Sequence, residues 1–166
     1  MFKLSTALVK LAKLKPGLTI VTTTLSVIGG VLGIKQYREN HPKVDMTGQW
    51  SVETTVTRSD LKRYEGLHLT FRVFLRQQGN RVSGNGEKWT ENGKVLPPSA
   101  RSQVTLEGTI DGDVLHLTYV ESGLKRSTLG QYDLQVKSDG LQCDGLMTGT
   151  AANASCATTW ERRAQF

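Results

Sequence analysis

The sequence predicts an all-β soluble domain, an eight-stranded up-and-down antiparallel barrel, with a transmembrane helix at its N-terminus. Beyond residue 46 the chain alternates apolar and polar residues with a period of two and has no helical stretch, which is typical of half-buried strands. The tight-turn sequences Gly79-Asn80, Asp111-Gly112 and Asp139-Gly140 separate several of these runs. Residues 17–34 carry no charge. Consecutive short strands favour a barrel, which has no free sheet edge, and a β-sandwich is the alternative.

Residues 17–35 are predicted to form the transmembrane helix. Its uncharged residues span about 27 Å as a helix, enough for the hydrocarbon core of a thin bilayer. The charged sequence 35–38 ends the run. One alternative is a cleaved signal peptide, but no suitable cleavage site with a mature start follows the run. The other is a buried core helix, but the run lacks the polar face that such a helix in a small domain has.

The segments around this helix differ in character. Residues 1–16 place apolar side chains on one helical face and lysines on the other, which predicts an amphipathic helix on membrane lipid. Residues 36–46 are polar and are predicted to form a linker. Small residues at four-residue spacing in the span predict self-association of the helix, and these are Ser26, Gly29, Gly30 and Gly33.

Residues 47–163 are predicted to form the barrel. The predicted strands cover 47–58, 67–77, 81–90, 102–110, 114–121, 128–137, 141–149 and 155–163. The connections after the first, third and fifth strands are long, whereas those after the second, fourth and sixth are tight turns. Alternate connections of such a barrel lie at alternate ends, so one end is closed and the other is a loop-bearing mouth where ligands enter. The chain enters at the closed end, so we expect the mouth to point away from the membrane.

The predicted mouth combines basic and aromatic side chains, with a local net charge of about +3. Aromatic rings stack on bases and guanidinium groups bind phosphate oxygens in pairs, so this composition predicts a phosphorylated ligand that carries a base. The alternative is solvated loop charges and ordinary core aromatics. Whether Trp89 faces into the barrel or outward stays open. Regular alternation places Trp89 and Val82 on opposite faces of their strand, although both residue types are typical of a core. The candidate ligand-binding residues are Arg58, Lys62, Arg63, Tyr64, Trp89, Arg101, Tyr119, Lys125 and Arg126.

Charge and chemistry exclude several classes of function. The formal net charge is +6, but residues 1–46 hold seven basic and two acidic residues, so the rest is nearly neutral and duplex nucleic acid is not an expected partner. No catalytic triad, carboxylate pair, phosphate loop or metal-ligand spacing occurs. We therefore expect no enzymatic activity, cofactor or metal. Cys143 and Cys156 are predicted to be core residues, with a disulfide between them as the alternative.

The first and the last of the predicted strands carry a short sequence pattern. Gly48-x-Trp50 opens the first strand, and Trp160 followed by Arg162 or Arg163 ends the last. This resembles the calycin pattern of lipocalins and avidins, in which a basic residue of the last strand packs over the tryptophan at the closed end. The resemblance implies a closed barrel for a small ligand.

The chain as a whole, a short membrane anchor followed by one eight-stranded barrel, resembles the membrane-spanning β-barrel effectors of bacterial cyclic-oligonucleotide antiphage (CBASS) systems. The resemblance implies that the barrel binds a cyclic di- or trinucleotide. It also implies a homo-oligomer that disrupts the inner membrane. This oligomer would form through the transmembrane helix, and the barrel is a second candidate interface. That family commonly has two spans, whereas this chain shows one.

The sequence leaves alternatives open for the orientation of the barrel relative to the membrane and for the function of the protein. Four lysines precede the predicted span and three basic residues follow it closely, a bias that weakly favours a barrel outside the cell. The resemblance implies a single-pass protein of the bacterial inner membrane with a cytosolic barrel, and this is the orientation we expect. The alternative functions are a membrane-anchored, calycin-like carrier of a small apolar ligand and a structural membrane protein whose barrel contacts a partner.

Overall fold

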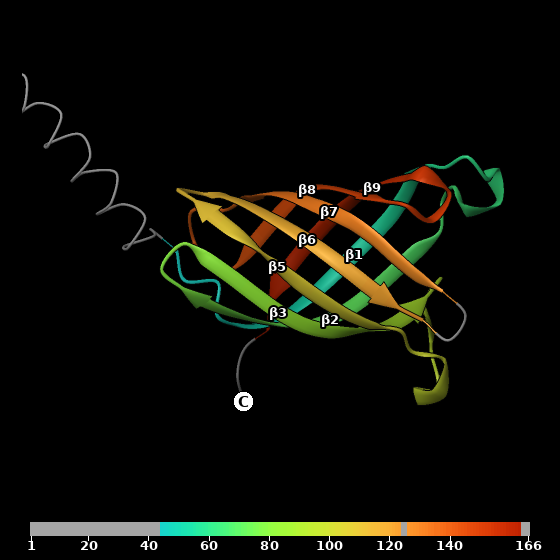
Figure 1. Cartoon of the computed structure of the whole chain (residues 1–166), viewed down its shortest axis with the longest axis horizontal. Coiled ribbons are helices and arrows are strands. Elements are labelled where there is room, and N and C mark those ends of the chain that lie inside the picture. The colour runs from blue at the N-terminus through green and yellow to red at the C-terminus, as the bar shows by residue number, and fades with distance from the viewer. Residues whose placement is uncertain (1–43, 124–125, 164–166) are drawn as a thin grey trace, which may run out of the picture. The chain divides into compact units, whose positions relative to one another are not determined.

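The structure is a computed structural model that describes residues 44–123 and 126–163 (Figure 1). The predicted amphipathic helix, transmembrane helix and most of the predicted linker lie outside these residues, as do Ser26, Gly29, Gly30, Gly33 and Lys125. Within the described ranges, no helix is long and apolar enough to cross a membrane.

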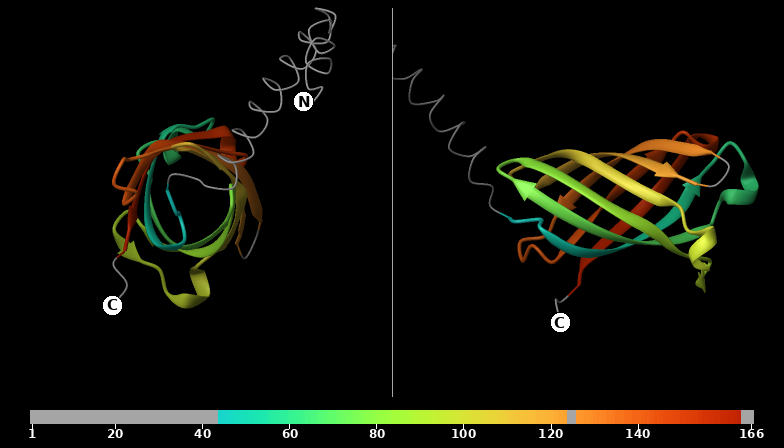
Figure 2. Two further views of the ribbon diagram at one scale, coloured as in Figure 1. Left: turned by 90° about the vertical axis from the view of Figure 1, so that its left-hand side faces the viewer. Right: turned by 60° about the horizontal axis from the view of Figure 1, so that its bottom comes forward.

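Eight long strands form the barrel: β1 (Gly48–Arg58), β2 (His68–Gln78), β3 (Arg81–Glu91), β5 (Gln103–Asp111), β6 (Val114–Ser122), β7 (Ser127–Val136), β8 (Gln142–Gly149) and β9 (Ala154–Arg162). Each pairs antiparallel with the next, and β9 pairs with β1 to close the barrel, as the view along its axis shows (Figure 2). A two-residue strand, β4 (Lys94–Val95), pairs antiparallel with the end of β3. The predicted all-β, eight-stranded antiparallel barrel is confirmed, and each predicted strand end lies within one residue of the observed one.

The core consists of the inward residues of every strand, because the side chains of a strand alternate between its two faces. An aromatic column runs through it, in which the rings of Trp50 and Trp160 lie 6.4 Å apart, those of Trp160 and Tyr132 5.2 Å, and those of Tyr132 and Tyr119 5.1 Å. Both tryptophans are fully buried. The column fills the barrel from its closed end towards its mouth.

The two ends of the barrel differ, as predicted for the connections after the first and third strands. The connection after the fifth strand, also predicted to be long, is confined to residues 123–126, of which the structure describes 123 and 126. The β2–β3, β5–β6 and β7–β8 connections are short turns with a positive-φ glycine, at Gly79, Gly112 and Gly140. The β1–β2, β3–β5 and β8–β9 connections lie at the opposite end and contain the 3₁₀ turns η2 (Lys62–Tyr64), η3 (Pro98–Ala100) and η4 (Ala151–Asn153) (Figure 1).

The closed end shows the arrangement expected of a calycin-like barrel. The indole N–H of Trp50 donates to the Met46 carbonyl at 2.9 Å. The Arg162 guanidinium lies over the Trp50 ring, 5.4 Å from its centroid, and donates to the carbonyl oxygens of Asp45, at 2.7 Å, and of Thr47. Met46, the last residue of the predicted linker, is fully buried here and belongs to the core.

The two cysteines are buried core residues with free thiols. Cys143 lies opposite Trp160 near the closed end, and Cys156 lies opposite Met147 near the mouth. Burial raises the pKa of Cys143 to about 12 and also raises the pKa of Cys156. Both thiols are therefore protonated and weakly nucleophilic at neutral pH.

Candidate ligand-binding site

A cavity of about 350 Å³ opens inside the barrel at the loop-bearing mouth. This volume is at the small end of the range of roughly 300–1,000 Å³ that ligand sites occupy. Apolar side chains line much of its wall, namely Val56, Leu67, Leu69, Met147 and Cys156. A small group of polar side chains completes it, and these are Tyr64, Lys88, Ser102, Tyr119, Glu121, Arg126 and Thr128.

Tyr119 of β6 forms part of the cavity wall with an unpaired hydroxyl. Its side chain lies over Gly130 and Gly149, where an added Cβ would come within 2.4 Å of the ring and 2.6 Å of the hydroxyl oxygen, respectively. The residue is only 2% exposed, and no described residue forms a hydrogen bond with the hydroxyl. Burial, and secondarily the carboxylate of Glu121, raise the pKa of Tyr119, so the hydroxyl keeps its proton.

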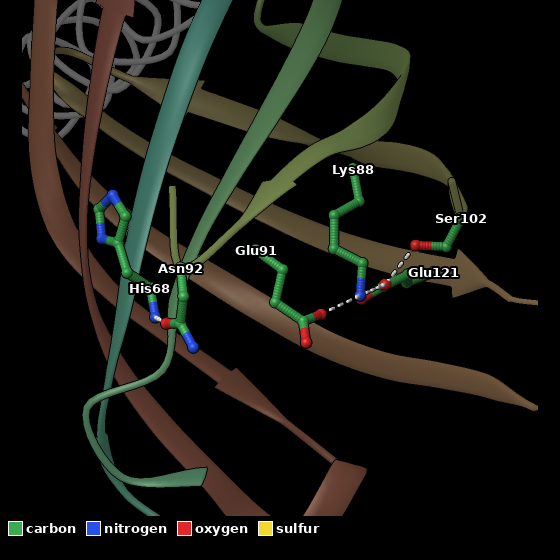
Figure 3. A network of polar contacts seen from close by, with 6 residues as sticks. All are labelled: His68, Lys88, Glu91, Asn92, Ser102 and Glu121. Carbon is green, nitrogen blue, oxygen red and sulfur yellow. Dashed lines mark hydrogen bonds and ion pairs between the residues drawn. The ribbon is translucent and has the colours of Figure 1, made fainter. Parts of the chain in front are cut away.

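Lys88, Ser102 and Glu121 form a polar network on the same wall (Figure 3). Glu121 Oε1 accepts a hydrogen bond from Ser102 Oγ at 2.5 Å and lies 3.1 Å from Lys88 Nζ. Lys88 Nζ also lies 3.9 Å from Glu91. The side chains of Lys88 and Glu121 are 19% and 15% exposed, so this ion pair is largely shielded from water.

Regular alternation along β3 decides which of its residues face the cavity, because the pairing with β2 is unbroken from Val82 to Lys88 and is interrupted only beyond Lys88 by a β-bulge. Thr70 pairs with Thr90 and Phe71 pairs with Lys88, which leaves Trp89 as the extra residue. Lys88 has the same parity as the buried Val82 and points into the barrel, whereas Trp89 points outward. The opposite parities of Val82 and Trp89 therefore give the correct facing of both residues, the first inward and the second outward.

On the outer face, the Trp89 ring is stacked between two guanidinium groups. Arg72 and Arg101 lie 3.4 Å and 3.7 Å from the ring centroid. Arg101 also forms an ion pair with Glu87 at 3.0 Å and donates to the Leu96 carbonyl at 3.0 Å. This stack fastens the β3–β5 connection to the barrel, so Trp89 and Arg101 stabilise the mouth from outside the cavity.

The rim of the cavity carries an aromatic ring between cationic groups. Arg63 Nη2 donates to the Tyr64 hydroxyl at 3.3 Å, and its guanidinium lies 5.0 Å from the ring centroid. The hydrogen bond and positive charge of Arg63, with a smaller contribution from Arg126, hold the pKa of Tyr64 below its ordinary value. This corner of the mouth therefore attracts anions.

The structure brings three of the predicted residues into the cavity wall, namely Tyr64, Tyr119 and Arg126. Arg63 lies beside Tyr64, and Arg58 and Lys62 are exposed at the same end of the barrel without lining the cavity. Lys88, Ser102 and Glu121 were not among the predicted site residues. Glu121 has the same parity as Tyr119, two residues away, which is a sequence signal that could have identified it.

The described side chains contain no cluster of three or more histidine, cysteine, aspartate or glutamate residues that could hold a metal ion. The polar groups of the cavity are hydrogen-bond donors and acceptors of both charges, arranged around an apolar floor, which suits the binding of a small organic molecule. No family model matches the chain, and neither a search of curated proteins nor a search of solved structures found a similar one.

Proposed function

We propose that this barrel is the sensing domain of a membrane-anchored receptor and that its ligand is a cyclic di- or trinucleotide. One observation carries the proposal: the mouth cavity has an apolar floor with an unpaired hydroxyl and a rim in which an aromatic ring lies among guanidinium groups. A nucleotide has the matching parts, a flat base and an anionic phosphate.

The size of the cavity limits how such a ligand would bind. At about 350 Å³ it accommodates part of a cyclic dinucleotide, so one base enters while the rest of the ring lies across the mouth. The phosphates then meet Arg126, which lines the rim, and Arg63 beside Tyr64. Guanidinium groups bind phosphate oxygens by charge-assisted hydrogen bonds.

The membrane half of the proposal rests on the sequence. Residues 17–35 would span the inner membrane once, with the barrel in the cytosol, and the small residues Ser26, Gly29, Gly30 and Gly33 would let the helices assemble. Ligand binding at the mouth would control this assembly, which would disrupt the membrane as an antiphage response. The protein would act by binding and assembly without catalysis.

A second candidate is a membrane-anchored, calycin-like carrier of a small apolar ligand. The observation in its favour is the apolar part of the cavity wall, above all Leu69, Met147 and Cys156. A carrier of this kind would make little use of Arg126, because an apolar ligand has no group for it to bind.

Thermal unfolding of the full-length protein in lipid nanodiscs distinguishes the two candidates. We expect a cyclic nucleotide from a panel of cyclic di-AMP, cyclic di-GMP, cyclic GMP–AMP and cyclic tri-AMP to raise the melting temperature, because a ligand that binds only the folded state stabilises it by about 2.7 kcal/mol at a hundred times Kd. Arg126→Ala should weaken this effect, and Arg76→Ala, exposed on β2, is the control. A shift with dodecanoic acid alone would favour the carrier, and no shift at all would contradict both.

A further inference from the structure

The inner face of β6 at the mouth carries two polar groups that the fold leaves ready for a ligand, the Glu121 carboxylate and the Tyr119 hydroxyl. We propose that this pair recognises the hydrogen-bonding edge of a guanine base, with Glu121 accepting from the N–H groups and Tyr119 donating to the carbonyl oxygen. The inference rests on the proposed function, because it names the base that enters the cavity.

Glu121 is held in place through one of its two oxygens. Lys88 Nζ and Ser102 Oγ both contact Oε1, at 3.1 Å and 2.5 Å, and come from β3 and from the residue before β5 (Figure 3). Oε2 has no hydrogen-bond donor among the residues that the structure describes. An ionised carboxylate accepts about four hydrogen bonds. The fold therefore fixes the orientation of this acceptor and leaves its second oxygen for a ligand.

Tyr119 supplies the complementary group. It faces the same side of β6 as Glu121, two residues earlier, which corresponds to a separation of about 7 Å along the strand. Its hydroxyl is buried and lacks a partner among the described residues, and a buried hydroxyl without a partner destabilises the fold. A ligand oxygen that accepts from it would remove that penalty. The binding free energy would thus become more favourable, because the ligand pairs a hydroxyl that destabilises the free protein.

The chemistry of the pair selects among bases. Guanine presents two N–H donors beside a carbonyl oxygen on its pairing edge, which matches a carboxylate oxygen with two lone pairs next to a hydroxyl donor. Adenine presents one amino group and a ring nitrogen on that edge, so it offers the carboxylate fewer donors. An aliphatic ligand would leave both protein groups unpaired and is disfavoured for that reason.

The test compares cyclic di-GMP with cyclic di-AMP on the full-length protein by calorimetric titration, since the two ligands share their backbone and charge and differ only in the base. We expect about tenfold tighter binding of cyclic di-GMP, in line with the discrimination of a good base contact. Glu121→Gln should abolish the preference. Glu91→Gln is the matched control, because Glu91 also contacts Lys88, at 3.9 Å, but does not line the cavity.

Tyr119→Phe gives a second readout. It should weaken cyclic di-GMP severalfold while leaving the unligated protein as stable as before or more stable, because it removes an unpaired buried hydroxyl. Equal binding of the two nucleotides, or an unchanged preference in Glu121→Gln, would overturn the guanine inference and leave the proposed function standing. Binding of neither nucleotide, with a shift produced by cyclic tri-AMP, which has no guanine, would also overturn it. The proposed function itself fails only if no cyclic nucleotide binds.

Discussion

Replacing Arg162 by alanine should destabilise the closed end of the barrel. Its guanidinium donates to two carbonyl oxygens, those of Asp45 and Thr47, and covers the Trp50 ring. These contacts join the last strand to the segment that enters the first strand. The substitution removes all of them and exposes one edge of a fully buried tryptophan.

The size of the effect follows from these contacts. A hydrogen bond that involves a charged group contributes about 1.5–3 kcal/mol when buried, and the bond to Asp45 is exposed, so the two bonds together contribute about 2 kcal/mol. The cation–π contact adds about 0.5 kcal/mol at a partly exposed site. A loss of about 2–2.5 kcal/mol corresponds to a decrease in melting temperature of roughly 6–10 °C for a domain of this size.

Urea unfolding followed by tryptophan fluorescence measures the change in the free energy of unfolding. Arg163→Ala is the matched control, because this neighbouring arginine is exposed and its side-chain contact is a 3.5 Å approach to Ser51 Oγ. Its loss should cost less than about 0.5 kcal/mol. If the two alanine variants unfold at the same urea concentration, the closed-end role of Arg162 is refuted.

Two further predictions concern backbone packing and pH. Gly108→Ala should destabilise the barrel by more than about 3 kcal/mol in urea unfolding, because its Cβ would lie 1.9 Å from the His116 carbonyl oxygen, whereas Gly123→Ala, with a nearest contact of 3.3 Å, should have a small effect. Hydrogen bonds from Thr47 lower the pKa of Asp45 below 3.8, so this carboxylate adds stability above its ordinary pKa that is lost as the pH falls through the lowered value. The melting temperatures of the wild type and Asp45→Asn should therefore differ slightly at pH 5 and converge as the pH falls below the lowered pKa of Asp45, and a constant difference would contradict this linkage.

The strands could be predicted because the apolar pattern and the turn residues agree with each other. In 67–75 every second residue is apolar, and the turn at Gly79 fixes where the next strand starts. Such agreement between local and global preferences is what specifies a fold. The bulge at Trp89 could not be located in this way, because an inserted residue shifts the alternation without a residue type that announces it.

The candidate site was harder to predict, because charges were assigned to the mouth by their position in loops. That approach found Tyr64 and Arg126 but also selected Arg101, which packs on the outer face against Trp89. It did not select Glu121, which lines the cavity. Lys88 has the parity of the buried Val82, and Glu121 has that of Tyr119, so alternation places both inside the barrel. Their pairing was missed because charged side chains were assigned to the loops.

The two ends of the barrel are built for different purposes. At the closed end, large rings fill the interior, and the hydrogen-bonding N–H of Trp50 is satisfied by the chain itself. At the mouth, the inward positions of the paired residues Gly130 and Gly149 carry no side chain, so Tyr119 lies flat against the wall and its hydroxyl stays unpaired beside an open cavity. A fold selected for stability alone would fill that space or pair that hydroxyl, since both omissions cost free energy. Two buried polar side-chain atoms lack a partner among the described residues: Trp160 Nε1 belongs to the aromatic column, whereas the Tyr119 hydroxyl belongs to a residue of the cavity wall, where the proposed ligand would pair it.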